Sequence, residues 1–416
     1  KAKEHGIALA VYSLLCLVFF KEIFAQTQWF SEDFFMQNFP NRFLAAVEIR
    51  NGSLPLWNPF VFSGMPFLAD IQTAVLYPFN LLMSLFVADN RLAFELYEYQ
   101  VALHFIPAGY FMYLYLRELA VEFFSALLGG MLFAFGGYFI NHAHHANMMN
   151  SWILLPAIFY CCLRGFKNDA RWFWACPILM TVSLLGGHPQ IAIFICYVFA
   201  VYYFCLAWEN CERIKLQTSA LRFAVVVVAF LLLSMVQIIP TAEFLQNANR
   251  SAMDFSGATQ DSLPPRGLWT VLFSNMFSFT YESWEQWEFR AYLGSGAILL
   301  AFLGLSGRTL PRTRFFWALA VLSLVLALGG NTPLYKLFYT LVPGFKFFRV
   351  PARFLYPFLF AVSVLAAQGL HFFIRAEERD LALKQLLRVS GIFLIAIPAC
   401  AVLLSKLPLQ QLGPHL

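Results

Sequence analysis

Long apolar segments alternate with short polar segments along almost the whole chain. An α-helix rises about 1.5 Å per residue, so roughly 20 apolar residues cross the hydrocarbon core of a bilayer. On this length criterion we predict about eleven spanning helices, at residues 6–25, 93–116, 122–140, 149–165, 172–187, 190–208, 222–240, 291–307, 314–330, 353–374 and 389–405. The pattern therefore predicts an all-α polytopic membrane protein, with residues 1–416 forming a single transmembrane domain.

One apolar segment does not fit this pattern. Residues 73–89 are apolar but short, and they contain Pro78 and Asn80. A segment of this kind is typical of an interfacial or re-entrant helix rather than of a span. We expect it to belong to a structured first loop, residues 26–92.

Lysine and arginine are concentrated in alternate loops. Cytoplasmic loops carry an excess of these residues, which places the N-terminus in the cytoplasm and the first span as a signal anchor. The segments expected on the opposite, extracytoplasmic side are residues 26–92, 141–148, 187–189, 241–290 and 331–352. The sequence thus predicts a multi-pass protein of the bacterial cytoplasmic (inner) membrane whose chemistry is extracytoplasmic. We also expect a further extracytoplasmic part beyond the last span.

Composition supports the same class. The chain is 60% hydrophobic and only 12% charged, against about 25% charged residues in soluble domains, so the lipid bilayer must be one of its partners. No basic stripe is present, which argues against nucleic acid as a partner. The cysteines lie mostly in apolar runs and are interpreted as buried thiols rather than as a disulfide framework.

Two adjacent carboxylates follow the first span. Glu32 and Asp33 are flanked by aromatic residues at the expected boundary between water and lipid. Such a place raises the pKa of a carboxylate by desolvation, or holds it charged beside a cation. Either state suits a general base that acts on a hydroxyl group. The alternative is a solvated acidic turn that ends the first helix.

The rest of the first loop is rich in proline and glycine, which favours fixed turns over regular helix. Asp70, Gln72 and Tyr77 are candidates to complete a polar pocket. Asp70 has a second interpretation, because aspartate is a favoured N-cap and residues 73–89 follow it directly.

Histidines mark the second extracytoplasmic segment. His142, His144 and His145 lie within four positions, without a neighbouring cysteine or carboxylate. A zinc site would need further ligands; contacts to phosphate or sugar hydroxyls, and an ordinary interfacial loop, are the alternatives. No cofactor is assigned, and a divalent cation is left open. His188 and Gln190 in the next short turn either face the same pocket or cap a helix hairpin.

Three cations lie in the last extracytoplasmic segment, against the charge bias of the other loops. Lys346, Arg349 and Arg353 are three and four residues apart, which puts them on one face if the segment is helical. Cations among phenylalanines at a membrane surface suit a lipid phosphate. The alternative is that they extend toward lipid headgroups without binding one molecule.

Several of these motifs together resemble a known family, the YfhO-type bacterial membrane proteins. The first-loop motifs are Asp33, Leu-Pro-Leu-Trp-Asn-Pro at 54–59, Ser-Gly-Met-Pro at 63–66, and Asp70 before Tyr77-Pro78. Weaker similarities are Gly-Gly-His-Pro-Gln at 186–190 and Phe-Arg-Val-Pro-Ala-Arg-Phe at 348–354. The resemblance implies a GT-C-like fold and sugar transfer from a polyprenyl-phosphate donor. It also implies that Asp33, beside Glu32, is the catalytic carboxylate and that Arg349 and Arg353 hold the donor phosphate.

We therefore expect an inverting GT-C-type glycosyltransferase that moves a sugar from a polyprenyl-phosphate-linked donor to an extracytoplasmic glycan, lipid or protein acceptor. Some members of the family decorate wall polymers such as lipoteichoic acid. In this hypothesis Lys346 assists the arginines in binding the phosphate, and the three loop histidines line the rim of the acceptor or donor site. A transporter or flippase of lipid-linked glycans is the first alternative, although transporters place coupling groups near the membrane midplane. A non-enzymatic envelope scaffold is the second.

Overall fold

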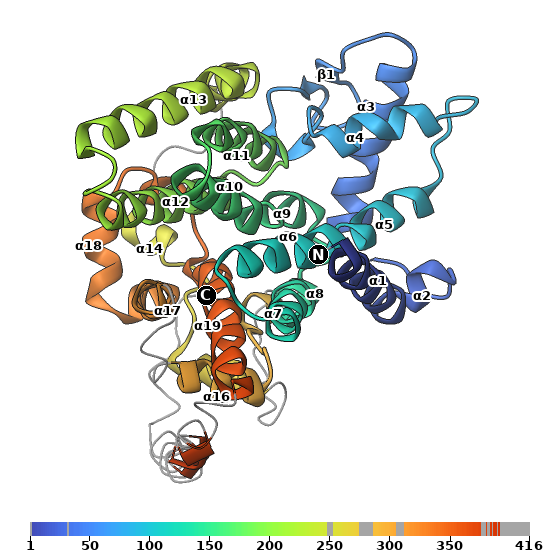
Figure 1. The fold of residues 1–416 in the computed structure, drawn as a ribbon. Helices are drawn as coiled ribbons and strands as arrows, with labels where there is room; N and C mark the ends of the chain where they lie inside the picture. Colours follow the sequence, from blue (N-terminus) through green and yellow to red (C-terminus); the bar gives the residue numbers. More distant parts are fainter. Residues whose placement is uncertain are drawn as a thin grey trace, which may run out of the picture.

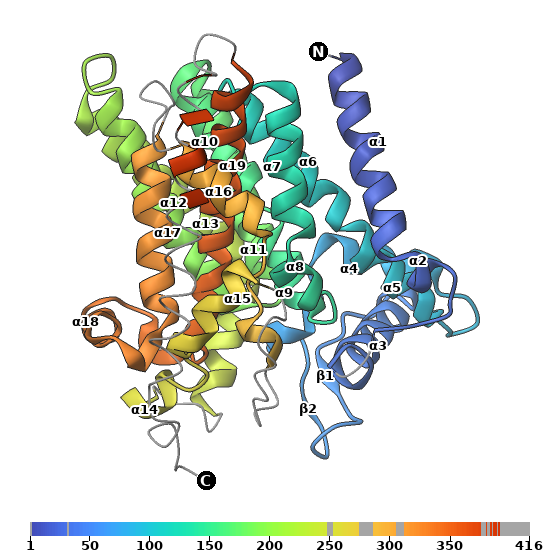
Figure 2. The same ribbon diagram turned by 90° about the horizontal axis from the view of Figure 1, so that it is seen from below.

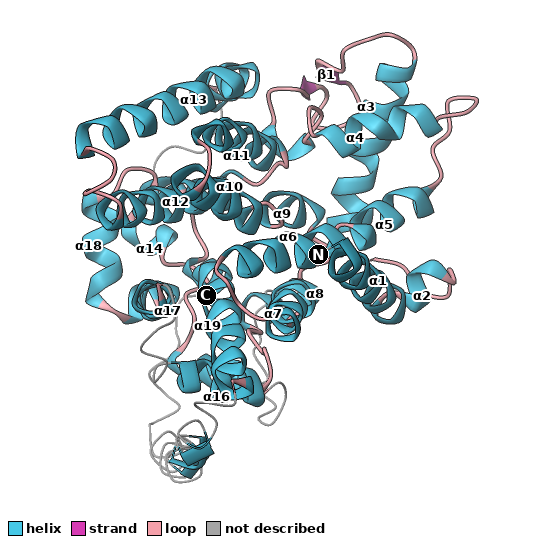
Figure 3. Cartoon of the chain, viewed as in Figure 1, coloured by secondary structure: helices cyan, strands magenta, loops and turns pink. Residues whose placement is uncertain are grey.

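The fold is a bundle of helices with one two-stranded hairpin (Figures 1 and 3). The computed structural model describes residues 2–30, 33–247, 253–273, 286–304 and 312–375, with a few single residues between 380 and 391. The helices in the first half are α1 (Ala2–Phe19), α2 (Lys21–Phe24), α3 (Phe39–Arg50), α4 (Pro78–Met83), α5 (Phe94–Leu103), α6 (Phe105–Glu118), α7 (Phe123–Phe135), α8 (Gly137–Asn141), α9 (Ala146–Trp152), α10 (Leu155–Lys167), α11 (Ala175–Leu185) and α12 (Pro189–Glu209). Those in the second half are α13 (Leu216–Gln246), α14 (Phe255–Ala258), α15 (Trp269–Leu272), α16 (Ser295–Gly304), α17 (Thr313–Ala327), α18 (Pro333–Leu341) and α19 (Leu355–Ile374).

Shorter elements connect them. Strands β1 (Trp57–Asn58) and β2 (Met65–Pro66) pair antiparallel, with Trp57 opposite Pro66. A π-helical turn, η1, covers Phe34–Asn38. The 3-10 turns are η2 (Ile71–Thr73), η3 (Ser84–Phe86), η4 (Ala170–Trp174), η5 (Pro265–Leu268), η6 (Gln286–Phe289), η7 (Gly329–Asn331), η8 (Phe345–Phe347) and η9 (Pro351–Phe354).

The predicted membrane-type helices are present, but the number eleven is not confirmed. Six stretches of the described chain are long and apolar enough to cross a membrane: Ala2–Phe19, Phe123–Asn141, Ala146–Lys167, Pro189–Glu209, Leu216–Gln246 and Pro351–Ile374. Ala170–Leu185, Ser295–Gly304 and Thr313–Ala327 are shorter apolar helices. The span predicted at 93–116 is divided into α5 and α6, because Pro107 in the first turn of α6 is incompatible with a continuous helix through Leu103. Most of the predicted span 389–405 lies outside the described residues.

The outer surface of the bundle is apolar, as a lipid-facing surface requires. α13 is 31 residues long, and most of its large apolar side chains are exposed, Leu221, Leu232 and Ile239 among them. α1 likewise exposes Leu14 and Val18. Apolar surface on this scale is not found on water-soluble monomers. The chain is therefore an all-α protein with membrane-type helices.

The segments expected outside the membrane gather at one end of the bundle. Figure 2 shows α2, α3, the β1–β2 hairpin, α14 and α18 at the end opposite to the start of α1. We call this end the loop end. The opposite end is marked by an ion pair of 3.0 Å between Glu4 and Arg117. Residues 73–89 stay at the loop side as α4 and η3, which are too short to span. Which end faces the cytoplasm stays a prediction.

The centre of the bundle is α19, whose residues are almost all buried. It crosses α16 closely because both helices carry glycine at the contact. A Cβ atom added to Gly369 would lie 1.8 Å from the carbonyl oxygen of Leu300. Since backbone atoms cannot give way as side chains do, this crossing depends on Gly369.

We expect Gly369→Ala to destabilise the protein by about 1–3 kcal/mol, the usual effect of forcing extra volume into a packed contact. Thermal unfolding of the detergent-solubilised protein would measure this. Gly296→Ala in α16 is the control, because no neighbouring atom lies within 4 Å of the added Cβ. Equal unfolding temperatures of the two variants would contradict a crossing of α16 and α19 that depends on Gly369.

Candidate functional site

Six polar side chains from separate parts of the sequence form a connected cluster at the loop end. We call them the polar cluster: Asp33, His142, His145, Gln190, Glu288 and Arg353. They lie before η1, between α8 and α9, at the start of α12, in η6 and in η9. Each contacts the next: Asp33–His145, His145–His142, His142–Glu288, Glu288–Arg353 and Arg353–Gln190. A continuous polar path therefore runs from a solvent-exposed carboxylate to a buried one.

The buried end of the cluster is an ion pair. Glu288 is 1% exposed, and its Oε1 accepts a hydrogen bond from Arg353 Nε at 2.8 Å and forms an ion pair with Arg353 Nη2 at 2.8 Å. Arg353 Nη1 donates to Oε1 of Gln190 at 2.9 Å. Burial alone would raise the pKa of Glu288, but Arg353 and His142 outweigh it and hold that pKa well below its ordinary value. Glu288 is therefore ionised at neutral pH, and it offsets the charge of Arg353.

The second oxygen of Glu288 binds a tyrosine and a histidine. Oε2 lies 3.1 Å from both the Tyr138 hydroxyl and His142 Nε2. His142 Nδ1 lies 2.8 Å from the Tyr138 carbonyl oxygen, which can only accept, so this nitrogen carries a proton. Both histidine contacts are hydrogen bonds only when Nε2 is protonated too. Burial lowers the pKa of His142 although the Glu288 carboxylate opposes this shift.

The exposed end of the cluster is Asp33. Its side chain is 60% exposed, and Oδ2 lies 3.6 Å from His145 Nε2. Contact with His145 lowers the pKa of Asp33 although partial burial opposes it; His144 and Arg353 add smaller effects of the same sign. The π-helical turn η1 starts directly after Asp33, and the Asn38 side chain donates to the Asp33 carbonyl at 3.0 Å. Asp33 is thus an ionised carboxylate on a fixed backbone at the exposed end of the polar cluster.

His144 and His188 lie beside the cluster. The His144 ring packs on His145 at 4.0 Å and edge-on to Trp287 at 5.5 Å. Burial and the neighbouring histidines lower the pKa of His144 to about 3, so it is neutral near pH 7. His188 caps α12, since its Nδ1 accepts from the Ile191 N–H, and burial followed by the charge of Arg353 lowers its pKa well below the ordinary value. The structure shows the capping role suggested for His188.

The cation segment is not one helical face, as the spacing had suggested. η8 and η9 are separate turns, because Phe348 is extended and Val350 is left-handed with φ of 63°. A β-branched residue rarely adopts that conformation, so the surrounding contacts must hold it there. The Val350 N–H donates to the Gln260 carbonyl, and Gln190 Nε2 donates to the Arg349 carbonyl at 2.8 Å. This kink directs Arg353 into the cluster.

Lys346 and Arg349 therefore do not share a helical face with Arg353. Lys346 is exposed, with its ammonium 5.7 Å from the Tyr339 ring, and Arg349 is half-buried. Arg349 is joined to the cluster through its carbonyl and Gln190. Of the three cations predicted to bind phosphate together, only Arg353 belongs to the polar cluster.

Two predicted residues of the first loop serve the loop itself. Asp70 caps η2 by accepting from the Gln72 N–H at 3.0 Å, and η2 rather than one helix over 73–89 follows it. The Tyr77 hydroxyl lies 2.8 Å from His104 Nε2, inside the packing of α4 against α5. Glu32 lies outside the described residues.

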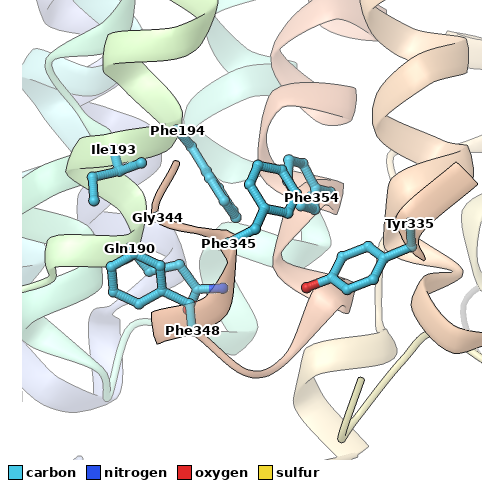
Figure 4. Close-up of a pocket in the computed structure, with 8 residues that line it drawn as sticks. All are labelled: Gln190, Ile193, Phe194, Tyr335, Gly344, Phe345, Phe348 and Phe354. Atoms are coloured by element: carbon cyan, nitrogen blue, oxygen red, sulfur yellow. The ribbon is translucent and has the colours of Figure 1, made fainter. Parts of the chain in front are cut away.

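An aromatic pocket adjoins the cluster through Gln190 (Figure 4). Its lining comprises Gln190, Ile193, Phe194, Tyr335, Gly344, Phe345, Phe348 and Phe354. Phe354 stacks on Phe194 at 4.1 Å and on Phe345 at 5.7 Å. The cavity between these side chains has a volume of about 10 Å³, which is enough for one water molecule. The stacking fixes η9, which carries Arg353.

Metal binding finds no support in the part of the chain that is described. No three histidine, cysteine, aspartate or glutamate side chains converge there closely enough to hold an ion. The histidines instead contact one carboxylate each or other rings: His142 pairs with Glu288, and His145 with Asp33.

The sequence analysis missed two residues that organise the site. Glu288 follows Trp287 and precedes Phe289, just before an apolar run, which is the same aromatic-flanked carboxylate pattern that marked Asp33. Arg42 in α3 is 1% exposed and donates to Asn147, which in turn donates to the Gln72 carbonyl. These contacts connect the first loop to the loop that carries the histidines. A single arginine in α3 gave no indication of this in the sequence.

One family matches the chain. It is described as a domain of unknown function (DUF6311), and the match covers residues 80–389. No curated protein and no solved structure matches the sequence. The matched range is well over half of the chain and includes five of the six cluster residues, all except Asp33. The chain belongs to the DUF6311 family.

Proposed function

We propose that the protein is a membrane glycosyltransferase that moves a sugar from a polyprenyl-phosphate donor to an acceptor hydroxyl, with Asp33 as the general base. The observation that carries the proposal is the Asp33–His145 pair: an ionised, accessible carboxylate beside an imidazole, at the loop end of a membrane-type bundle. A site at the bilayer surface suits a donor whose tail stays in lipid. The GT-C-like fold and YfhO-type kinship belong to this proposal, as does an extracytoplasmic, bacterial location.

The proposed reaction is a single displacement. The acceptor oxygen forms a bond to the anomeric carbon while the bond from that carbon to the phosphate oxygen breaks. The acceptor proton passes to Asp33, and the electron pair of the broken bond leaves with polyprenyl phosphate. Attack opposite to the leaving group inverts the anomeric configuration. Arg349 and Lys346 stabilise the departing phosphate as its charge grows.

Glu288 changes the role proposed for Arg353. Because the buried carboxylate offsets its charge, Arg353 contributes less to phosphate binding than an unpaired arginine would. Its first role in this proposal is to hold Gln190 and the 343–353 segment in place, through the hydrogen bonds that link Arg353, Gln190 and the Arg349 carbonyl. In this proposal the histidines at positions 142, 144 and 145 form the rim of the acceptor or donor site.

The direct test is release of polyprenyl phosphate from a panel of polyprenyl-phosphate sugars by the purified protein, with membrane extract as the source of acceptor. We expect release with at least one donor, and an inverted anomeric bond in the product by NMR. Lipid binding without release from any donor would overturn the proposal. It would favour the transporter or scaffold, which a liposome transport assay of fluorescent lipid-linked glycan would distinguish.

The pH dependence of kcat/KM provides a separate prediction. Because His145 lowers the pKa of Asp33, this carboxylate stays ionised as pH falls. The decrease of kcat/KM on the acid side of the profile should therefore lie below the ordinary aspartate value of 3.8. The stabilisation from this pair is likewise present above that value and lost as pH falls through the lowered pKa. We expect His145→Ala to move the limb upward. Circular dichroism at each pH checks folding, and an unmoved limb would separate Asp33 from the proton transfer.

A further inference from the structure

A second candidate site lies at the opposite end of the bundle from the polar cluster. It is a groove of about 340 Å³ lined by Phe111, Leu114, Ala157, Tyr160, Cys161, Trp172, Ala175, Ile178 and Leu179. α10 packs against both α6 and α11 and forms the floor, where Ala157 and Cys161 leave room. Figure 1 shows α10 together with these two neighbours. The wall of the groove exposes only apolar atoms.

The groove opens to the outside of the bundle. Ile178 on its α11 wall is more than half exposed, and Trp174 at the start of that helix is exposed as well. In a membrane this face contacts lipid, so an acyl chain can enter from the side. The small side chains of the floor give the groove a fixed shape, unlike the flat exposed face of α13.

One rim of the groove carries an arginine in an unusual setting. The Arg164 guanidinium lies over the Trp172 ring at 4.5 Å, and Nη1 donates to the Tyr160 hydroxyl at 2.7 Å. Nε lies 3.8 Å from Glu118, beyond hydrogen-bond reach. Within the described chain neither Nε nor Nη2 of Arg164 has a hydrogen-bond partner; Nε is buried, whereas Nη2 is not. Nη2 is therefore available to donate a hydrogen bond to a phosphate oxygen.

The charge at this rim is not balanced. Arg164 and Lys167 share a single carboxylate, Glu118, at 3.8 and 3.6 Å. The pair of cations therefore keeps one excess positive charge. Tyrosine and tryptophan beside these cations are typical of the level of lipid headgroups. Basic pockets between helices on the cytoplasmic side bind anionic headgroups, and the positive-inside pattern places this end there.

We propose that this groove is a binding site for one phospholipid with a net negative headgroup. An acyl chain lies along Ala157 and Cys161, and a phosphate oxygen accepts a hydrogen bond from Arg164 Nη2. This inference does not rest on the proposed transferase activity, because no residue of the polar cluster takes part. An anionic lipid here would stabilise the packing of α6, α10 and α11.

The test is native mass spectrometry of the full chain with equal amounts of phosphatidylglycerol and phosphatidylcholine. We expect wild type to retain phosphatidylglycerol preferentially, and Arg164→Gln to lower that preference about fivefold, the usual effect of one basic residue at a membrane surface. Arg171→Gln is the matched control: the same charge change at the same end, on a side chain that is 89% exposed and paired with Asp169. It should leave the preference unchanged.

Ala157→Leu tests the binding of the acyl chain separately from the binding of the headgroup, because it fills the floor of the groove without changing the charge at the rim. We expect it to lower retention of both lipids, with unfolding temperature as the check on folding. The proposal is overturned if wild type shows no preference for phosphatidylglycerol. It is equally overturned if Arg171→Gln lowers the preference as much as Arg164→Gln, since diffuse surface charge would then explain the binding.

Discussion

Replacing Asp33 by asparagine should lower kcat for sugar transfer by about 10²–10⁴-fold, the range that general-base catalysis contributes. The substitution keeps the size of the side chain but removes its capacity to take the acceptor proton. Because Asp33 is largely exposed and its backbone is held by Asn38, the fold should be unaffected. Release of polyprenyl phosphate under saturating donor measures the loss, and donor binding measured separately should stay near the wild-type value.

Asp89→Asn is the matched control for Asp33→Asn. Asp89 is exposed in the same first loop and has φ of 51°, a left-handed conformation that asparagine tolerates well. It should transfer sugar at the wild-type rate. If Asp33→Asn kept full activity, Asp33 would have no part in proton transfer. Glu32, its neighbour outside the described residues, would be the next carboxylate to replace.

The class of fold could be predicted because hydropathy directly reflects the solvent around each helix. α12 begins and ends within two residues of the predicted span at 190–208, since Pro189 and the polar residues after Trp208 mark its ends. Breaks inside apolar runs were not predicted. The run at 122–140 is interrupted at Gly136, whose extended backbone lets the Gly137 N–H donate to the Tyr292 carbonyl. That contact joins residues far apart in sequence, so no local pattern indicates it.

The site was predicted only where composition stood out locally. Clustered histidines and the aromatic-flanked Asp33 attracted attention, and the structure brings His142, His145 and Asp33 together. Whether they act as proposed stays a prediction. The condition for a shared helical face of Lys346, Arg349 and Arg353, a helical segment, is not met, because the left-handed Val350 interrupts it. Tertiary contacts to Gln190 and Gln260 impose that conformation, and neither partner is near in sequence.

The second large effect concerns Glu288. Glu288→Gln should destabilise the protein by about 3–5 kcal/mol, because Arg353 would keep its charge in a buried place without an opposing one. Unfolding in SDS followed by circular dichroism measures this. Asp169→Asn is the matched control, since it breaks an ion pair of 2.7 Å that is exposed. Exposed pairs contribute little, so its unfolding midpoint should equal that of wild type.

A double variant separates the charge pair from the rest of the network. In Glu288→Gln with Arg353→Gln both charges are gone, so the double variant should be more stable than either single one. Stability need not return to the wild-type value, because His142 and Tyr138 also bind Glu288. If the two losses simply added, the Arg353–Glu288 contact would have no coupling energy, and the cluster would be held together by packing around η6 and η9. A positive coupling energy would mean that the buried pair stabilises the fold. Low transfer activity in the same double variant would mean that the pair also keeps the 343–353 segment where Arg349 can reach a phosphate.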